Sequence, residues 1–236
     1  CVCGNTEQRD FVEALGHIDA DSDALCDRCG EKTQRGPASQ DENGVYLIGT
    51  ANQLIWFQEF VNEGNADISA KLTADIDLRD IHWIGIGTKE QPFAGSFDGD
   101  GHTIRNMTVS YAGDTNDALY CGLFGSIAGT TQTHAIVKNL TLTGSMDFQM
   151  AGSGSYAFSG GLAGAVSLAE ITDVTVDVAI SLEKTGTRGS WAYLGGFAGR
   201  GDRTVFTRCE NKGDITGLSN VAGFVGGNGY EYNRAN

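Results

Sequence analysis

Four of the six cysteines lie near the N-terminus, in a spacing that could hold a metal ion. Cys1 and Cys3 form a Cys-x-Cys pair, and Cys26 and Cys29 form a Cys-x-x-Cys pair. Four thiolates in two close pairs are the ligand set of a tetrahedral structural zinc site. In an extracellular protein the same cysteines could instead form two disulfides. Either would staple residues 1–31, a segment too short to bury a core of its own; free thiols are the remaining alternative.

An aspartate-rich loop between these cysteine pairs has the spacing of a calcium-binding loop. In such a loop, positions 1, 3, 5 and 9 carry side-chain ligands and position 7 uses a backbone carbonyl. The residues at these positions are Asp19, Asp21, Asp23, Leu25 and Asp27. The loop resembles those of thrombospondin type 3 repeats and dockerins. Ala24 replaces the usual glycine and Gly30 the usual bidentate glutamate, so a solvated acidic loop without calcium is the alternative.

Aromatic residues form a third group that could do chemistry, here by binding. They lie in or beside stretches that read as irregular loops, at 112–118, at 144–159 and around Arg188. Loops that project from a rigid scaffold are frequent binding sites, and aromatic rings there could stack on sugars or anchor a protein partner. They could also fold back over the scaffold. The candidate binding-loop residues are Tyr111, Tyr120, Phe148, Tyr156, Trp191 and Tyr193.

The sequence contains none of several phrases that mark enzymes. It has no Gly-x-Ser-x-Gly, no His-Glu-x-x-His and no phosphate-binding loop. Asp98 and Asp100 could form the carboxylate pair of a glycosidase, but Asp-Gly-Asp-Gly is foremost a turn signal. We therefore predict a protein without catalytic residues. A polysaccharide lyase or glycosidase is the alternative from a different class.

The charge of the chain restricts its partners. The net charge is −14, which argues against nucleic acid and anionic membranes as partners because both attract an excess of Lys and Arg. No stretch approaches the ~18 consecutive apolar residues of a membrane-spanning helix, and no signal peptide is present. Since the chain opens directly on Cys1, we expect it to be part of a longer exported protein.

A four-residue motif that occurs four times indicates the fold that positions the candidate binding residues. Each copy has two glycines around two apolar residues, and the copies begin at Gly122, Gly161, Gly196 and Gly223. Runs rich in β-branched residues follow three of them, at 136–143, 171–176 and 205–209. Self-similarity at a period of tens of residues indicates units that bury their apolar faces against each other. Because these units are strands, the phrase predicts a β-solenoid.

The glycine content supports this architecture. The chain has 34 glycines, about twice the usual ~7 %. Glycine adopts positive φ without strain, which sharp corners between strands need, and it lets one backbone approach the next closely. A glycine-rich β-sandwich with coincidental repeats is the alternative.

The four phrases resemble the GLUG repeat of bacterial surface proteins. The segment before them, Trp83–Gly87 followed by Phe93–Ile104, resembles the coil that often leads into such repeats, so the similarity covers roughly residues 44–229. The resemblance implies a right-handed parallel β-helix in a secreted or cell-surface protein, and related segments occur in adhesin-like proteins. From the candidate loops we expect such a protein to bind a host protein or glycan. Related segments occur in the N-terminal parts of IgA-cleaving metallopeptidases, which makes an accessory domain of a surface peptidase a further alternative.

The chain therefore divides into three parts. Residues 1–31 form the small Cys- and Asp-rich module, residues 32–43 a polar linker, and residues 44–236 the all-β solenoid. Within the solenoid, Thr50 and Gln53 have the spacing of a helix capping box. Apolar residues then recur at helical spacing up to Gly64. We predict that this helix covers the first coil, because an uncovered end would expose unpaired strand backbone.

Overall fold

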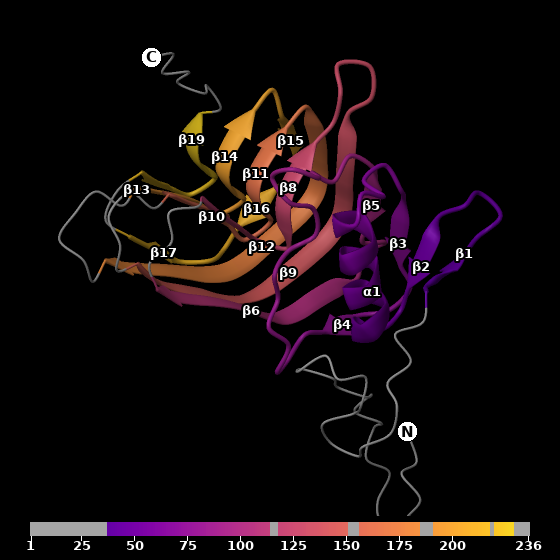
Figure 1. Ribbon diagram of the computed structural model, residues 1–236, viewed down its shortest axis with the longest axis horizontal. Helices are drawn as coiled ribbons and strands as arrows, with labels where there is room; N and C mark the ends of the chain where they lie inside the picture. The colour runs from indigo at the N-terminus through magenta and orange to yellow at the C-terminus, as the bar shows by residue number, and fades with distance from the viewer. Residues whose placement is uncertain (1–36, 114–117, 151–155, 185–190, 218–219, 229–236) are drawn as a thin grey trace, which may run out of the picture.

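The computed structural model describes residues 37–113, 118–150, 156–184, 191–217 and 220–228, and Figure 1 shows their arrangement. These residues are mostly β-strand, with one helix, and most strand pairs are parallel. The predicted all-β class is confirmed. The predicted Cys- and Asp-rich module at 1–31 lies outside the described residues. Among the helices described, none has the length and hydropathy to cross a membrane.

Three sheets contain the strands, and we call them sheets I, II and III. Sheet I has eleven strands: β1 (Ser39–Gln40), β2 (Tyr46–Ile48), β3 (Ala70–Leu72), β4 (Ile76–Asp77), β5 (Ser96–Asp98), β6 (Thr103–Gly113), β9 (Ala135–Met150), β12 (Ala169–Lys184), β15 (Val205–Thr207), β16 (Glu210–Asn211) and β17 (Ile215–Thr216). Sheet II has four: β7 (Leu119–Cys121), β10 (Tyr156–Gly160), β13 (Trp191–Gly195) and β18 (Val221–Ala222). Sheet III also has four: β8 (Phe124–Ala128), β11 (Ala163–Ser167), β14 (Ala198–Asp202) and β19 (Val225–Asn228).

Each repeat carries the chain through the three sheets in the same order. One passage runs through β7, β8 and β9, the next through β10, β11 and β12, and the next through β13, β14 and β15. Every strand pairs in parallel with its equivalent in the next passage. In Figure 1 the long strands β6, β9 and β12 form one layer, with β10 and β13 over one end and β8, β11 and β14 over the other.

The repeated phrase forms the corner between sheet II and sheet III. Its second residue points into the core: Leu123, Leu162 and Phe197 are buried, and Phe197 stacks on Phe224 with ring centroids 4.5 Å apart. Backbone hydrogen bonds link successive corners, for example from Leu162 N to Phe197 O at 3.1 Å. The repeat residues therefore stack one above another along the molecule.

The corner glycines are required by close packing. A Cβ at Gly122 would lie 2.6 Å from the carbonyl oxygen of Gly160 in the next passage. A Cβ at Gly164 would lie 2.7 Å from the backbone nitrogen of Cys121. Both glycines have ordinary φ angles. Close approach of one coil to the next is thus confirmed as their role, whereas the expected positive φ is wrong at these corners.

Three polar residues supply positive φ instead, at one position of sheet I. Asn139, Asp173 and Arg208 have φ of 54°, 55° and 50° and lie at equivalent points of successive passages. Polar residues such as Asn and Asp tolerate this conformation better than most, because the short side chain can bond locally. In a regular strand, residues three positions apart point to opposite faces. The left-handed residue shifts this alternation by one position, so Val137 and Leu140 are both buried. The alternation of buried and outward-facing side chains therefore breaks at this point.

Helix α1 (Ala51–Asn62) packs on the N-terminal end of the core. Thr50 is its N-cap and accepts a hydrogen bond from Gln53 N at 3.2 Å, which confirms the predicted helix start. The Gln53 side chain accepts from Gly49 N at 2.8 Å, one residue before the expected partner. The Phe57 ring contacts Phe93 and Phe97 at centroid distances of 6.1 Å. The helix therefore covers the first strands, as predicted.

A short hairpin lies within the segment that was expected to be a linker. Residues 32–43 read as a linker, yet within them Ser39 and Gln40 in β1 pair antiparallel with β2, and Ala38 is buried. Asp41 holds the intervening turn, since its carboxylate accepts hydrogen bonds from Asn43 N and Val45 N at 2.8 and 2.9 Å. This polar hairpin looked like a linker because its strand has only two residues.

Candidate functional site

Two of the six aromatic candidates lie on strands of sheet I: Phe148 is in the core, and Tyr111 is partly buried against it. Phe148 is 1 % exposed on β9, and it pairs with Tyr111 on β6. The expected place of Phe148 on a binding loop is wrong, because β9 continues as a strand to Met150, and Tyr111 lies within β6. Gly144 suggested a loop but sits within the strand, where any side chain would collide with the backbone of Met107.

Tyr120, Phe158 and Tyr193 form a column of stacked rings on the outer face of sheet II. They lie on β7, β10 and β13 at paired positions. The rings of Tyr120 and Phe158 are 5.0 Å apart with planes 25° apart, and those of Phe158 and Tyr193 are 5.3 Å and 11° apart. Such offset stacking stabilises aromatic pairs beyond their buried area. The column fixes the three rings in place.

Tyr156 and Trp191 form a second, more exposed pair beside this column. They face each other across β10 and β13, and their exposed fractions are 44 % and 51 %. The Tyr156 ring lies nearly parallel to that of Phe158, with centroids 6.5 Å apart. The column and this pair together we call the aromatic face. Its members are Tyr120, Tyr156, Phe158, Trp191 and Tyr193.

Four members of the aromatic face were candidate binding residues in the sequence analysis, but they were expected on loops and lie on strands. Phe158 also lies in the stretch 144–159 that was expected to form a loop, but it was not among the six selected candidates. The signal that could have found it is an aromatic residue at every second position directly before two of the repeat phrases, as in Tyr156-x-Phe158 and Trp191-x-Tyr193. This spacing places both rings of a pair on one face of a strand.

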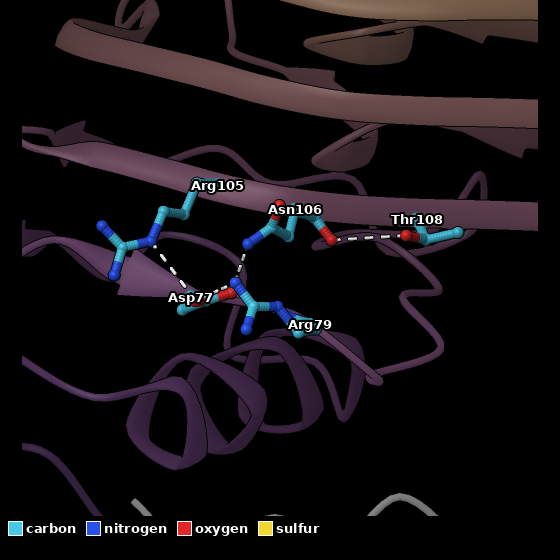
Figure 2. A network of polar contacts seen from close by, with 5 residues as sticks. All are labelled: Asp77, Arg79, Arg105, Asn106 and Thr108. Atoms are coloured by element: carbon cyan, nitrogen blue, oxygen red, sulfur yellow. Dashed lines mark hydrogen bonds and ion pairs between the residues drawn. The ribbon is translucent and has the colours of Figure 1, made fainter. Parts of the chain in front are cut away.

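Charged groups on sheet I serve mainly to link its strands. Figure 2 shows Asp77 of β4, whose carboxylate accepts hydrogen bonds from Asn106 Nδ2 at 2.7 Å and Arg105 Nε at 3.3 Å. Partial burial favours the neutral form of Asp77, but the hydrogen bonds from Asn106, the Arg79 backbone and Arg105 outweigh it and lower its pKa. This network therefore holds β4 against β6.

Asp98 and Asp100 are paired with lysines. Lys138 Nζ lies 3.2 Å from Asp98 Oδ2, and Lys71 Nζ lies 2.9 Å from Asp100 Oδ2. Asp98 Oδ1 also accepts from Asp100 N at 2.9 Å, which confirms the predicted turn. Partial burial opposes ionisation of Asp98, but hydrogen bonds from Asn139, Asp100 N and Lys138 lower its pKa. A glycosidase acid needs a raised pKa, which is the opposite of the direction at Asp98.

Within the described ranges, no group of three or more His, Cys, Asp or Glu side chains could hold a metal ion. The predicted zinc or disulfide cysteines and the predicted calcium loop lie outside these ranges. Both cysteines inside them are free. Burial raises the pKa of Cys121 to about 12 and also raises the pKa of Cys209, so neither thiol is activated as a nucleophile.

Comparison of the chain with family models, with curated proteins and with solved structures gave no match.

Proposed function

We propose that this protein is a non-catalytic binding module of an extracellular bacterial surface protein, of adhesin type. Its three sheets are the faces of a right-handed parallel β-helix built from GLUG-type repeats. The regular addition of one strand to each sheet per repeat supports this architecture. Parallel crossovers are right-handed in ≈ 98 % of cases, which supports the handedness.

The observation that carries the proposal is the aromatic face. Tyr156 and Trp191 project from adjacent strands of a rigid sheet, and the stacked column beside them fixes the surface in shape. Exposed aromatic rings held on a rigid scaffold are typical of binding surfaces, because they bury a large area and lose little conformational entropy.

The proposed ligand is a glycan or a host protein. An amphipathic ring such as that of Tyr or Trp can stack on the C–H face of a sugar and still hydrogen-bond at its polar end. The net charge of −14 favours ligands that are neutral or basic over nucleic acids and anionic lipids. Zinc or calcium in residues 1–31 stays a prediction.

A binding screen tests the proposal. The chain is applied to an array of glycans and host extracellular proteins, next to a Tyr156→Ala/Trp191→Ala double variant. Both side chains are about half exposed, so the variant should keep its fold. Val205→Ala removes an apolar side chain that is 56 % exposed on sheet I and serves as the matched control.

We expect the wild-type chain and the control to bind the same ligand and the double variant to lose at least about tenfold in affinity. Absence of any ligand for the wild-type chain would contradict the proposal. Binding that the double variant retains in full would also contradict it.

A further inference from the structure

The passage of the chain before the first repeat phrase skips sheet II. His82 pairs with Thr108 of sheet I, and only four residues later Ile86 pairs with Phe124 of sheet III. Trp83 lies in this direct connection between sheets I and III, and its indole nitrogen donates a hydrogen bond to Leu123 O at 3.0 Å. In the part of the chain that the structure describes, β7 is therefore the last strand of sheet II on this side.

A hollow lies at this step in the structure, next to the end of the aromatic column. Its volume is about 360 Å³, at the lower end of the ~300–1,000 Å³ range of ligand pockets. Tyr120 lines it, and Phe158 covers the side of Tyr120 that faces β10. Ile84 adds a second apolar surface and is 64 % exposed. The other lining residues are Gly87, Thr88, Lys89, Glu90, Ala118 and Gly125.

Among the described residues, the hollow lies at the Tyr120 end of the column, whereas a backbone segment packs on the ring at the other end. At the opposite end the backbone of Gly227 lies against Tyr193, since a Cβ on that glycine would be 2.9 Å from Tyr193 Cε1. Neighbouring strands are ~4.8 Å apart, and the rings of the column follow that spacing. A flat ring in the hollow would occupy the next position of the column, on Tyr120.

A tight turn places polar groups around this position. Thr88 N donates to Gln91 O at 2.9 Å, and Gln91 N donates to the Thr88 hydroxyl at 3.0 Å. Lys89 and Glu90 lie at the tip of this turn and line the hollow. They provide one hydrogen-bond donor group and one acceptor group, with no net charge between them.

The floor of the hollow is fixed by the end of helix α1. Asn62 accepts a hydrogen bond from Gly87 N at 2.7 Å and donates to Gly85 O at 3.2 Å. Gly85 and Gly87 have φ of 93° and 74°, a conformation that other residues rarely adopt. A site held in one shape before binding loses little entropy when its ligand arrives.

We propose that this hollow binds a single neutral pyranose ring, stacked on Tyr120 and Ile84, as the terminal sugar of a glycan. A pyranose has an apolar C–H face that matches the two side chains. Its hydroxyls can accept from Lys89 and donate to Glu90 and Thr88. An aromatic side chain of a peptide would match Tyr120 but leave these polar groups without a role. This inference rests on the proposed function and assigns its ligand class.

Titration with simple sugars tests the site. The probes are the methyl glycosides of glucose, galactose, mannose and N-acetylglucosamine, followed by saturation-transfer NMR and by the aromatic resonances of the protein. We expect one of them to bind and to shift the Tyr120 resonances. Tyr120→Leu should weaken binding about tenfold because the flat face is lost, whereas Tyr120→Phe should retain it.

Two further variants separate a local effect from misfolding. Ile84→Ala alters an exposed side chain and should weaken binding by a smaller factor without changing the fold. Val205→Ala lies on sheet I and should bind as the wild type does. Equal binding by Tyr120→Leu and wild type, or no binding of any probe, would overturn the site. A ligand lost by the Tyr156/Trp191 double variant but kept by Tyr120→Leu would overturn only the hollow and leave the aromatic face intact.

Discussion

Arg208 lies opposite Asp173 on sheet I and donates two hydrogen bonds to its carboxylate, from Nε to Oδ1 at 2.6 Å and from a terminal nitrogen to Oδ2 at 2.5 Å. Both residues have left-handed backbone, with φ of 50° and 55°. The ion pair therefore links two strained bends in successive passages. It lies at the surface, so its contribution is expected to be small and sensitive to salt.

This ion pair predicts a specific pH dependence. The Arg208 hydrogen bond lowers the pKa of Asp173 below its usual value of 3.8 in the folded protein. The stabilisation is therefore complete above the usual value and is lost as the pH falls from there through the lowered pKa. Asp173→Asn should flatten the loss of stability at acid pH, measured by urea unfolding between about pH 5 and pH 2. Asp177→Asn on the same strand is the control, and an unchanged acid slope in Asp173→Asn would contradict the account.

Replacing a corner glycine with alanine should destabilise the protein strongly at Gly122 and only slightly at Gly223. A Cβ at Gly122 would meet the Gly160 oxygen at 2.6 Å and Ala163 N at 2.8 Å. We therefore expect Gly122→Ala to lower the free energy of unfolding by about 1–3 kcal/mol, the usual effect of overpacking. Gly223 is the same position of the last repeat, and a Cβ there has no atom of the described residues within 4 Å. Gly223→Ala should change stability by less than about 1 kcal/mol.

Urea unfolding of the two glycine variants provides the measurement. Equal destabilisation by both substitutions would show that the phrase glycines serve the local backbone conformation. A difference between them supports the packing of one coil against the next.

The partly buried Cys121 gives a third prediction. Burial raises the pKa of Cys121 to about 12, so almost no thiolate forms at neutral or mildly basic pH. We expect Cys121 to resist alkylation in the folded protein at pH 8 and to react fully in denaturant, as read by mass spectrometry of its peptide. Fast labelling of Cys121 in the folded protein would show that its surroundings are more open.

Local signals in the sequence predicted part of this fold. The four repeat phrases predicted where the chain turns between sheets II and III, because their glycines and apolar residues have fixed packing partners in each coil. Thr50 and the Asp98–Gly101 phrase were identified correctly because capping and turn chemistry depend on a few neighbouring residues. These features need little information from distant parts of the chain.

The aromatic face and the reversed alternation could not be predicted in the same way. At Asn139 the phase of burial changes because of one left-handed residue, and nothing in the apolar pattern shows the backbone angle. Gly144 looked like a loop residue, but its role is to admit the backbone of Met107 from the adjacent strand. Which aromatic residues share a face depends on register between passages, which sequence spacing alone does not fix.

The most direct test of the account is hydroxyl-radical footprinting of the chain with and without the strongest ligand from the array. Oxidation of Trp191 and Tyr156 is measured by mass spectrometry, with the exposed Val205 as reference. The account predicts that a saturating ligand protects Trp191 and Tyr156 and leaves Val205 unchanged. Full oxidation of Trp191 and Tyr156 in the complex, with protection on another surface, would contradict it.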